Sequence, residues 1–236
     1  TDKLKLSSHK FSCLKKINTL TLSKNVGSQR AIALGLLYIK KIKNDFIVTV
    51  MDSDGEDDPV EVSKMISLAM KNSNYVITSN RKSRKETRII IFLYHLHLLL
   101  TFLFTLKWVS FGNFTCFHKK NLSRLFIDNS SFCAHSSAVM KNCSIKRIYA
   151  KRKKRYFDKS KLGLASLIEH SLRVNAVFFK NIICSSIIYI FFFTIFLPEV
   201  LNLFLLTLIL TFNLLIVFMR FKYPKKYISH SKQKVL

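Results

Sequence analysis

The chain has 236 residues; its 39 Lys and Arg against 13 Asp and Glu give a formal net charge of +26, and 49% of it is hydrophobic. A disordered basic tail would contain far fewer apolar residues. A collagen-like or disulfide-framework protein would need many more glycines or cysteines than the five of each found here. The length therefore suits one domain of about 150–180 residues and a further segment.

The basic charge has more than one explanation. Lys, Asn, Ile and Phe are abundant and Gly is scarce, which is the composition that an AT-rich genome produces by codon bias alone. Clustered Lys and Arg also suit nucleic acid or an anionic membrane surface. No zinc-finger spacing, RNP-like aromatic motif or helix-turn-helix signal accompanies the charge. The membrane is therefore the partner to test against the rest of the sequence.

The first predicted elements alternate between strand and helix. Ile17–Leu22 reads as a short strand, Gly27 gives a turn, and Ala31–Lys43 has the apolar spacing of a helix. Phe46–Met51 is a β-branched apolar run, typical of a strand buried on both faces of a parallel sheet. Strand, helix and strand in this order predict a βαβ unit and an α/β fold.

The next helix has clear start signals. Asp58 suits the N-cap, Pro59 the first helical position, and Glu61 the third position of a capping box. We predict that this helix runs to about Lys71 and that a strand follows over Tyr75–Thr78. The helix is expected to bury one apolar face, formed by Val62, Met65, Ile66 and Ala69.

The negative charge is concentrated after the second strand, where residues 52–61 contain six of the 13 carboxylates. Asp52 and Asp54 follow that strand directly, at the carboxyl end where open α/β sheets bind their ligands. Neighbouring carboxylates repel one another unless a cation lies among them, and Mg²⁺ prefers oxygen ligands and bridges to phosphates. We therefore predict that Asp52 and Asp54 are functional. Asp58 and Glu61 have a simpler explanation as helix caps, and Glu56 and Asp57 lie between the two cases.

The apolar stretch Ile89–Leu106 is long enough to cross a membrane, but basic residues flank it on both sides. We predict a helix that lies in the membrane interface or packs on the domain, with a true span as the alternative. His95 and His97 lie two positions apart, so on a helix they point in nearly opposite directions. They are interpreted as interfacial residues and not as metal ligands.

Two uncharged segments near the C-terminus predict a transmembrane hairpin, namely Ile182–Leu197 and Val200–Met219, with Pro198 and Glu199 between them. Two buried helices of a soluble core would require polar faces that these segments lack. Lys and Arg flank both outer ends and are absent from the connecting loop, which predicts cytoplasmic ends by the positive-inside rule. The cysteines then lie in a reducing compartment and are interpreted as free thiols: Cys13, Cys116, Cys133, Cys143 and Cys184.

Several motifs together resemble the family 2 glycosyltransferases, in particular the polyprenyl-phosphate glycosyltransferases related to dolichol-phosphate mannose synthase. NVGSQRAIALGL from Asn25 is similar to the family's N-x-G-x-x-x-A-x-x-x-G-L line, and MDSDGEDDPVE from Met51 is similar to its aspartate motif. NRKSRKE, FGNFTCF and RKKRYFDKSK follow in the order in which the family has a basic pair, a G-D-F-R-L element and an R-x-x-R-x-x-G-x-S-K element. The resemblance covers roughly residues 17–220, and two C-terminal transmembrane helices are common in that family.

The resemblance implies roles for individual residues. Asp52 would contact the nucleotide, Asp54 the metal and the diphosphate, and Glu56 would be a further ligand of Mg²⁺ or Mn²⁺. Asp54 and Asp57 would be the catalytic carboxylates, with Asp57 as a general base if the acceptor is a sugar hydroxyl. Arg81 would contribute to the donor site. The remaining residues would bind donor diphosphate or the phosphate of a lipid acceptor: Arg84, Arg152, Arg155, Ser160 and Lys161. For residues 151–155 a solvated or lipid-facing basic patch is the alternative.

The chain departs from the family pattern at three positions. Asn113 and Thr115 stand where the G-D-F-R-L element has Asp and Arg, and Asp158 stands where the basic loop has Gly. These departures affect the identity of the sugar and the acceptor. The family's first strand, which contacts the nucleotide base, has no counterpart before Leu20, so the sequence is interpreted as a fragment that lacks its first βα unit.

The predicted architecture is an α/β, GT-A-like (Rossmann-like) nucleotide-diphospho-sugar transferase domain over residues 1–165, with an interfacial helix at 89–106. A juxtamembrane helix (166–181), two transmembrane helices (182–219) and a basic cytoplasmic tail (220–236) follow. The predicted function is metal-dependent, inverting transfer of a hexose from a nucleotide-sugar donor to a polyprenyl phosphate or related envelope-lipid or glycan acceptor.

The expected location is the cytoplasmic face of a membrane, taken to be the bacterial inner membrane, with homo-oligomers possible and no nucleic-acid partner. The alternative is a non-catalytic, membrane-anchored basic protein, a degenerate relative that binds lipid or nucleic acid.

Overall fold

The computed structural model describes residues 17–81, 87–150, 153, 156, 163–222 and 234–235. Four strands form a mixed sheet in the order β2-β4-β3-β5. These strands are β2 (Ile47–Val50), β3 (Tyr75–Arg81), β4 (Phe111–His118) and β5 (Ser144–Ala150). The short strands β1 (Leu20–Thr21) and β6 (Lys234–Val235) pair with each other and not with this sheet.

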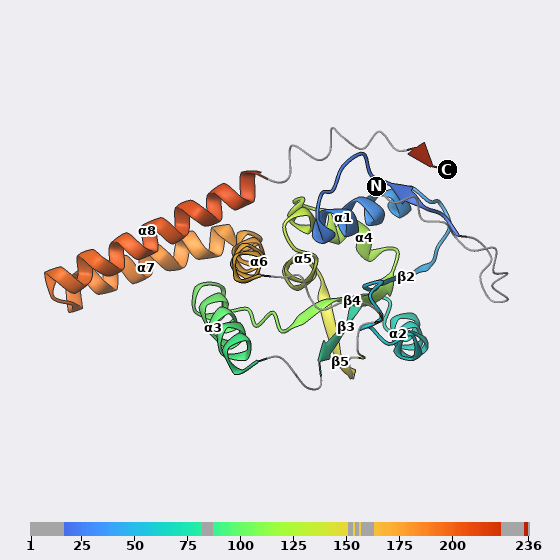
Figure 1. Ribbon diagram of the computed structural model, residues 1–236, viewed down its shortest axis with the longest axis horizontal. Helices are drawn as coiled ribbons and strands as arrows, with labels where there is room; N and C mark the ends of the chain where they lie inside the picture. The colour runs from blue at the N-terminus through green and yellow to red at the C-terminus, as the bar shows by residue number, and fades with distance from the viewer. Residues whose placement is uncertain are drawn as a thin grey trace.

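The helices of the domain cover both faces of the sheet (Figure 1). In chain order they are α1 (Ser28–Lys40), α2 (Pro59–Lys71), α3 (Arg88–Thr105), α4 (Asn121–Leu125), the 3-10 helix η1 (Ser130–Phe132), α5 (His135–Asn142) and α6 (Leu164–Ala176). The predicted N-cap is confirmed, because the Asp58 carboxylate accepts a hydrogen bond from the Val60 N–H at 3.0 Å. Met65 and Ala69 of the same helix are fully buried, as its apolar spacing predicts.

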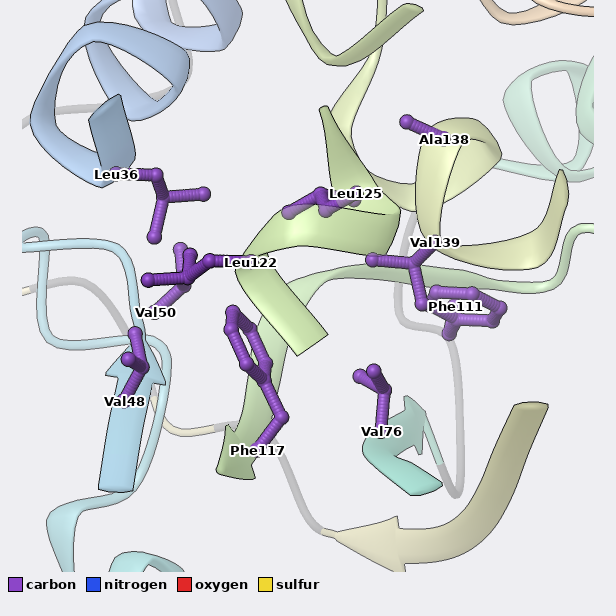
Figure 2. Packing of buried hydrophobic residues seen from close by; sticks show 10 residues of the cluster. All are labelled: Leu36, Val48, Val50, Val76, Phe111, Phe117, Leu122, Leu125, Ala138 and Val139. Carbon is purple, nitrogen blue, oxygen red and sulfur yellow. The ribbon is translucent and has the colours of Figure 1, made fainter. Parts of the chain in front are cut away.

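Alternation along the strands divides the core into two layers. On one face, Val48 of β2, Val76 of β3 and Phe117 of β4 pack against α1, α4 and α5 (Figure 2). On the other face, Ile77 and Cys116 pack against α2. Neighbouring residues of one strand therefore enter opposite layers.

The prediction that Phe46–Met51 is a fully buried parallel strand of a βαβ unit is wrong in its pairing. β2 is an edge strand whose partner is β4, and the two are antiparallel. Val48 and Val50 are buried, whereas Ile47 and Thr49 are only partly covered. The β-branched run specifies an extended, half-buried segment, but its partner comes from more than 60 residues further along the chain, which periodicity does not reveal.

The apolar C-terminal segments form two long helices, α7 (Phe179–Phe196) and α8 (Glu199–Lys222), which extend side by side away from the domain (Figure 1). Their large side chains are widely exposed, with Phe191 at 69% and Leu214 at 72%. Together with α3, they are the described helices that are long and apolar enough to cross a membrane. This exposed apolar area is consistent with membrane association.

The hairpin contacts α3 and α6. The hydroxyls of Ser185 and Tyr189 on α7 donate to the carbonyls of Phe104 and Leu103 at 2.8 and 2.5 Å. His97 of α3 hydrogen-bonds Ser171 of α6 at 2.7 Å, while His95 bonds the backbone carbonyl of its own helix at Ile91. The two histidines thus have different partners, as their spacing predicts.

The cysteines that the structure describes are free thiols, as predicted: Cys116, Cys133, Cys143 and Cys184. Cys13 lies outside the described residues. Burial raises the pKa of the Cys143 thiol to about 11.

Candidate functional site

Strand direction places three loop starts at one edge of the sheet. β2 and β3 are both antiparallel to β4, and β5 is parallel to β3, so β2, β3 and β5 all run the same way. Their carboxyl ends and the amino end of β4 therefore share an edge. Asp52 lies just beyond β2, Arg81 ends β3, and the basic segment 151–161 follows β5. The acidic loop follows β2 and the basic segment follows β5, and these are the two outer strands of the sheet.

The loop of residues 52–58 is held by its own side chains. The Asp54 carboxylate accepts from the Glu56 N–H at 3.1 Å, and the Asp57 carboxylate accepts from the Asp52 N–H at 2.9 Å. Gly55 turns the chain with φ +84, a conformation that favours glycine. Asp54 and Glu56 thus belong to one tight turn, and Asp57, which is 9% exposed, closes the loop behind them.

The basic segment contacts this loop directly. The backbone N–H groups of Lys153 and Tyr156 donate to the carbonyls of Glu56 and Asp54, each at 3.0 Å. The Tyr156 ring packs over Gly55 so closely that a Cβ at Gly55 would lie 2.4 Å from it. The ammonium group of Lys153 also lies 3.0 Å from the Asp58 carboxylate. The hydrogen bond from the Val60 N–H, and then that from Lys153, lower the pKa of Asp58.

The structure brings four of the predicted site residues together in this loop: Asp52, Asp54, Glu56 and Asp57. Arg81 lies at the same edge, where its backbone pairs with Ala150 of β5, but its side chain is outside the described part of the protein. The other predicted phosphate-binding residues also lie outside the described residues: Arg84, Arg152, Arg155, Ser160 and Lys161.

A partly buried chain of hydrogen-bonded polar groups next to the acidic loop was not expected from the sequence. Asn113 of β4 donates to the Asp52 carboxylate at 3.2 Å and accepts from the Gln29 amide of α1 at 2.9 Å. Gln29 in turn accepts from the His135 N–H at the start of α5 at 2.7 Å. The only signal in the sequence was at Asn113, a position where the chain departs from the pattern that it otherwise resembles. Gln29 had none.

His135 is the residue at which this hydrogen-bond chain begins. Its side chain is completely buried, and Nε2 lies 2.8 Å from the hydroxyl of Thr115, the second departure from the family pattern. Its other ring nitrogen, Nδ1, has no hydrogen-bond partner among the described residues. Burial lowers the pKa of His135 to about 4, so the imidazole is neutral at pH 7. The two departures, Asn113 and Thr115, therefore belong to one network.

The donor set of the loop suits a hard cation. Asp54 and Glu56 offer carboxylate oxygens from one turn, which is the ligand type that Mg²⁺ and Mn²⁺ take. Within the ranges that the structure describes, no three His, Cys, Asp or Glu side chains converge as a complete metal site. A scan of the sequence against protein-family models finds no match, and a search of curated proteins finds none either.

Proposed function

We propose that the protein is a metal-dependent glycosyltransferase that transfers a sugar from a nucleotide-sugar donor to a polyprenyl phosphate or related envelope lipid at the cytoplasmic face of a membrane. One observation carries the proposal: the backbone of Lys153 and Tyr156 in the basic segment hydrogen-bonds the turn of Asp54 and Glu56, and the Lys153 ammonium pairs with Asp58 of the same loop. A loop rich in carboxylates next to a basic segment suits a metal-bound diphosphate. The order of the sequence motifs, which resembles that of polyprenyl-phosphate glycosyltransferases, supports the same function.

The proposed reaction needs little acid–base chemistry from the chain. An oxygen of the lipid phosphate attacks the anomeric carbon while the bond from that carbon to the diphosphate breaks, which inverts the sugar and releases a nucleoside diphosphate. Mg²⁺ or Mn²⁺ held by Asp54 and Glu56 would supply charge neutralisation of the leaving diphosphate. The attacking oxygen of a lipid phosphate is already anionic, so no base is needed to deprotonate it. Only a hydroxyl acceptor would call for a base, and Asp57 is the candidate for that role.

The proposed membrane placement rests on α3 as well as on the hairpin. Asn80 near the end of β3 pairs with Phe111 at the start of β4. The segment that leads from β3 into α3 and the segment that leads from α3 into β4 therefore start and finish at neighbouring positions in the sheet. The six Cα steps from Thr105 to Phe111 reach at most roughly 22 Å, which is shorter than the hydrocarbon core of about 30 Å. If α3 crossed the membrane, β4 could not return to β3. We therefore place α3 along the membrane surface, and α7 and α8 across the membrane.

The test is a transfer assay with membranes that contain the full-length protein, radiolabelled nucleotide sugars and a polyprenyl phosphate. Replacing Asp54 by Ala should lower the transfer rate at least about 100-fold, because it removes a ligand that stabilises the leaving diphosphate. Asp45→Ala is the matched control. Asp45 is an exposed carboxylate in the loop before β2, at the opposite edge of the sheet, and its loss should leave the rate unchanged.

Full activity of Asp54→Ala, or transfer that persists after divalent cations are removed by EDTA, would overturn the mechanism. The non-catalytic alternative predicts a different result. In that case the protein would bind anionic vesicles or nucleic acid in a salt-sensitive manner, this binding would survive replacement of Asp52 and Asp54, and no donor would be consumed.

A further inference from the structure

The hydrogen-bond chain that ends on Asp52 has a fixed direction. It begins at the His135 N–H, which can only donate, and ends at the Asp52 carboxylate, which in its ionised form can only accept. Gln29 must therefore turn its oxygen toward His135 and its NH₂ toward Asn113. Asn113 must then turn its oxygen toward Gln29 and its NH₂ toward Asp52. No amide in the chain can be reversed without placing two acceptors, or two donors, face to face.

The chain also links parts of the protein that are distant in sequence. Gln29 and Asn113 are 84 residues apart, and His135 and Gln29 are 106 apart. Gln29 is 4% exposed, so a broken bond there would leave a buried polar group unpaired, which costs more than the bond itself contributes. The carboxylate of Asp52 is therefore held against α1, β4 and α5 together, and not only by its own loop.

We propose that Asn113 and Gln29 are positioning residues that orient the Asp52 carboxylate for its contact with the nucleotide of the donor, a role that rests on the proposed function. An Asp at position 113, as in the G-D-F-R-L element that this segment resembles, would place a second carboxylate beside Asp52. In this chain, the amide of Asn113 donates a hydrogen bond to the Asp52 carboxylate, which an ionised carboxylate at position 113 could not do. Gln29 acts one step further away, because it sets the direction in which the Asn113 amide points.

The sharpest test exploits two residues that do not touch. Gln29→Glu keeps the size of the side chain but replaces the NH₂ by a second acceptor. While the introduced carboxyl is ionised, Asn113 must turn its NH₂ toward it and its oxygen toward Asp52, so two acceptors meet. Asp52→Asn removes that conflict, because an amide at position 52 can donate to the reversed Asn113. Gln29→Glu should therefore lower the unfolding midpoint further in the Asp52 protein than in the Asp52→Asn protein, because the cost of burying the new carboxyl is common to both and only the Asp52 protein adds the conflict.

The measurements use the full-length protein in detergent or lipid nanodiscs. Thermal unfolding of the parent, the two single variants and the double variant forms one double-mutant cycle. Titration with UDP and with GDP in the presence of Mn²⁺ measures binding of the nucleoside diphosphate. Gln29→Glu should weaken the binding of the nucleotide that the parent prefers by about tenfold, the loss expected from misplacing one charge-assisted contact.

Asn121→Ala is the control for lost stability alone. Asn121 follows the other end of β4, is 1% exposed, and donates to the Ser73 and His118 carbonyls at 2.9 and 3.2 Å. This variant should unfold earlier and bind the nucleotide as the parent does.

If the changes in unfolding midpoint of the two single variants add up to the change in the double variant, the hydrogen-bond chain does not have the fixed direction proposed here. A coupled cycle with unchanged nucleotide binding in Gln29→Glu would overturn the positioning role. Failure of the proposed function looks different, because the parent itself would then bind neither UDP nor GDP and would transfer no sugar.

Discussion

At the scale of single residues, His135 makes stability depend on pH. In the folded protein, burial lowers its pKa to about 4, against an ordinary value of 6.5. The unfolded chain therefore binds a proton at a higher pH than the folded protein does. The stabilising contribution of neutral His135 is complete above about pH 6.5 and is lost progressively as the pH falls toward 4, by up to about 1.4 kcal/mol per pH unit.

We expect His135→Gln to remove this part of the pH dependence, since Gln can still face the Thr115 hydroxyl but does not titrate. The measurement is the free energy of unfolding of both proteins between pH 7.5 and 4.5. His170, whose pKa is also lowered mainly by burial, is present in both proteins and cancels in the comparison. Parallel pH profiles for the two proteins would show that His135 is not the group responsible.

At the scale of elements, the end of α8 is fastened to the domain by Arg220. Its guanidinium donates to the Asp128 carbonyl at 2.6 Å and lies 3.7 Å from the Asp128 carboxylate. Lys141 of α5 forms an ion pair with the same carboxylate and also donates to the Val177 carbonyl between α6 and α7 at 3.1 Å. Although burial alone would raise the pKa of Asp128, the hydrogen bonds from Lys141 and Ser130 hold it well below its usual range.

Replacing Arg220 by Ala should therefore separate the hairpin from the domain before either part unfolds. We expect the amides of α5 and of the last turn of α8 to exchange with deuterium faster, and the free energy of unfolding to fall by about 1.5–3 kcal/mol, the range for hydrogen bonds to charged groups. Lys180→Ala is the control, because it removes an exposed cation from the first turn of α7. Equal exchange in Arg220→Ala and Lys180→Ala would mean that the Asp128 contact does not fasten the hairpin.

At the scale of the whole molecule, the proposed placement predicts which residues reach each side of the membrane. The test uses single cysteines in a chain whose natural cysteines have been replaced, labelled with a maleimide that does not cross membranes. Glu199→Cys, at the first residue of α8, should react only from the outer face of spheroplasts. Lys180→Cys at the base of α7 should react only in inside-out vesicles.

The same experiment tests α3, because Arg88→Cys and Lys107→Cys lie at its two ends. Both should react in inside-out vesicles if α3 lies on the membrane surface. Reaction of these two positions from opposite faces would contradict the placement, and with it the argument from the short connection between α3 and β4.

The sequence by itself determined the features that depend on neighbouring residues. The Asp58 cap and the apolar spacing of α2, the extended conformation of β2 and the lengths of α7 and α8 all follow from local sterics, hydrogen bonding and hydropathy. The cluster of carboxylates after a strand was also visible as a candidate site, because the turn that holds Asp54 and Glu56 is formed by consecutive residues.

Only the tertiary structure decided which strands pair and what lies beneath the site. The position of β4 between β2 and β3 makes β2 an edge strand and ties both connections of α3 to one place. It also brings Asn113 to Asp52, and Gln29 to Asn113 across 84 residues of sequence. The physical reason is that these contacts form between segments distant in the chain, and no local propensity or periodicity carries information about which distant segment will be the partner.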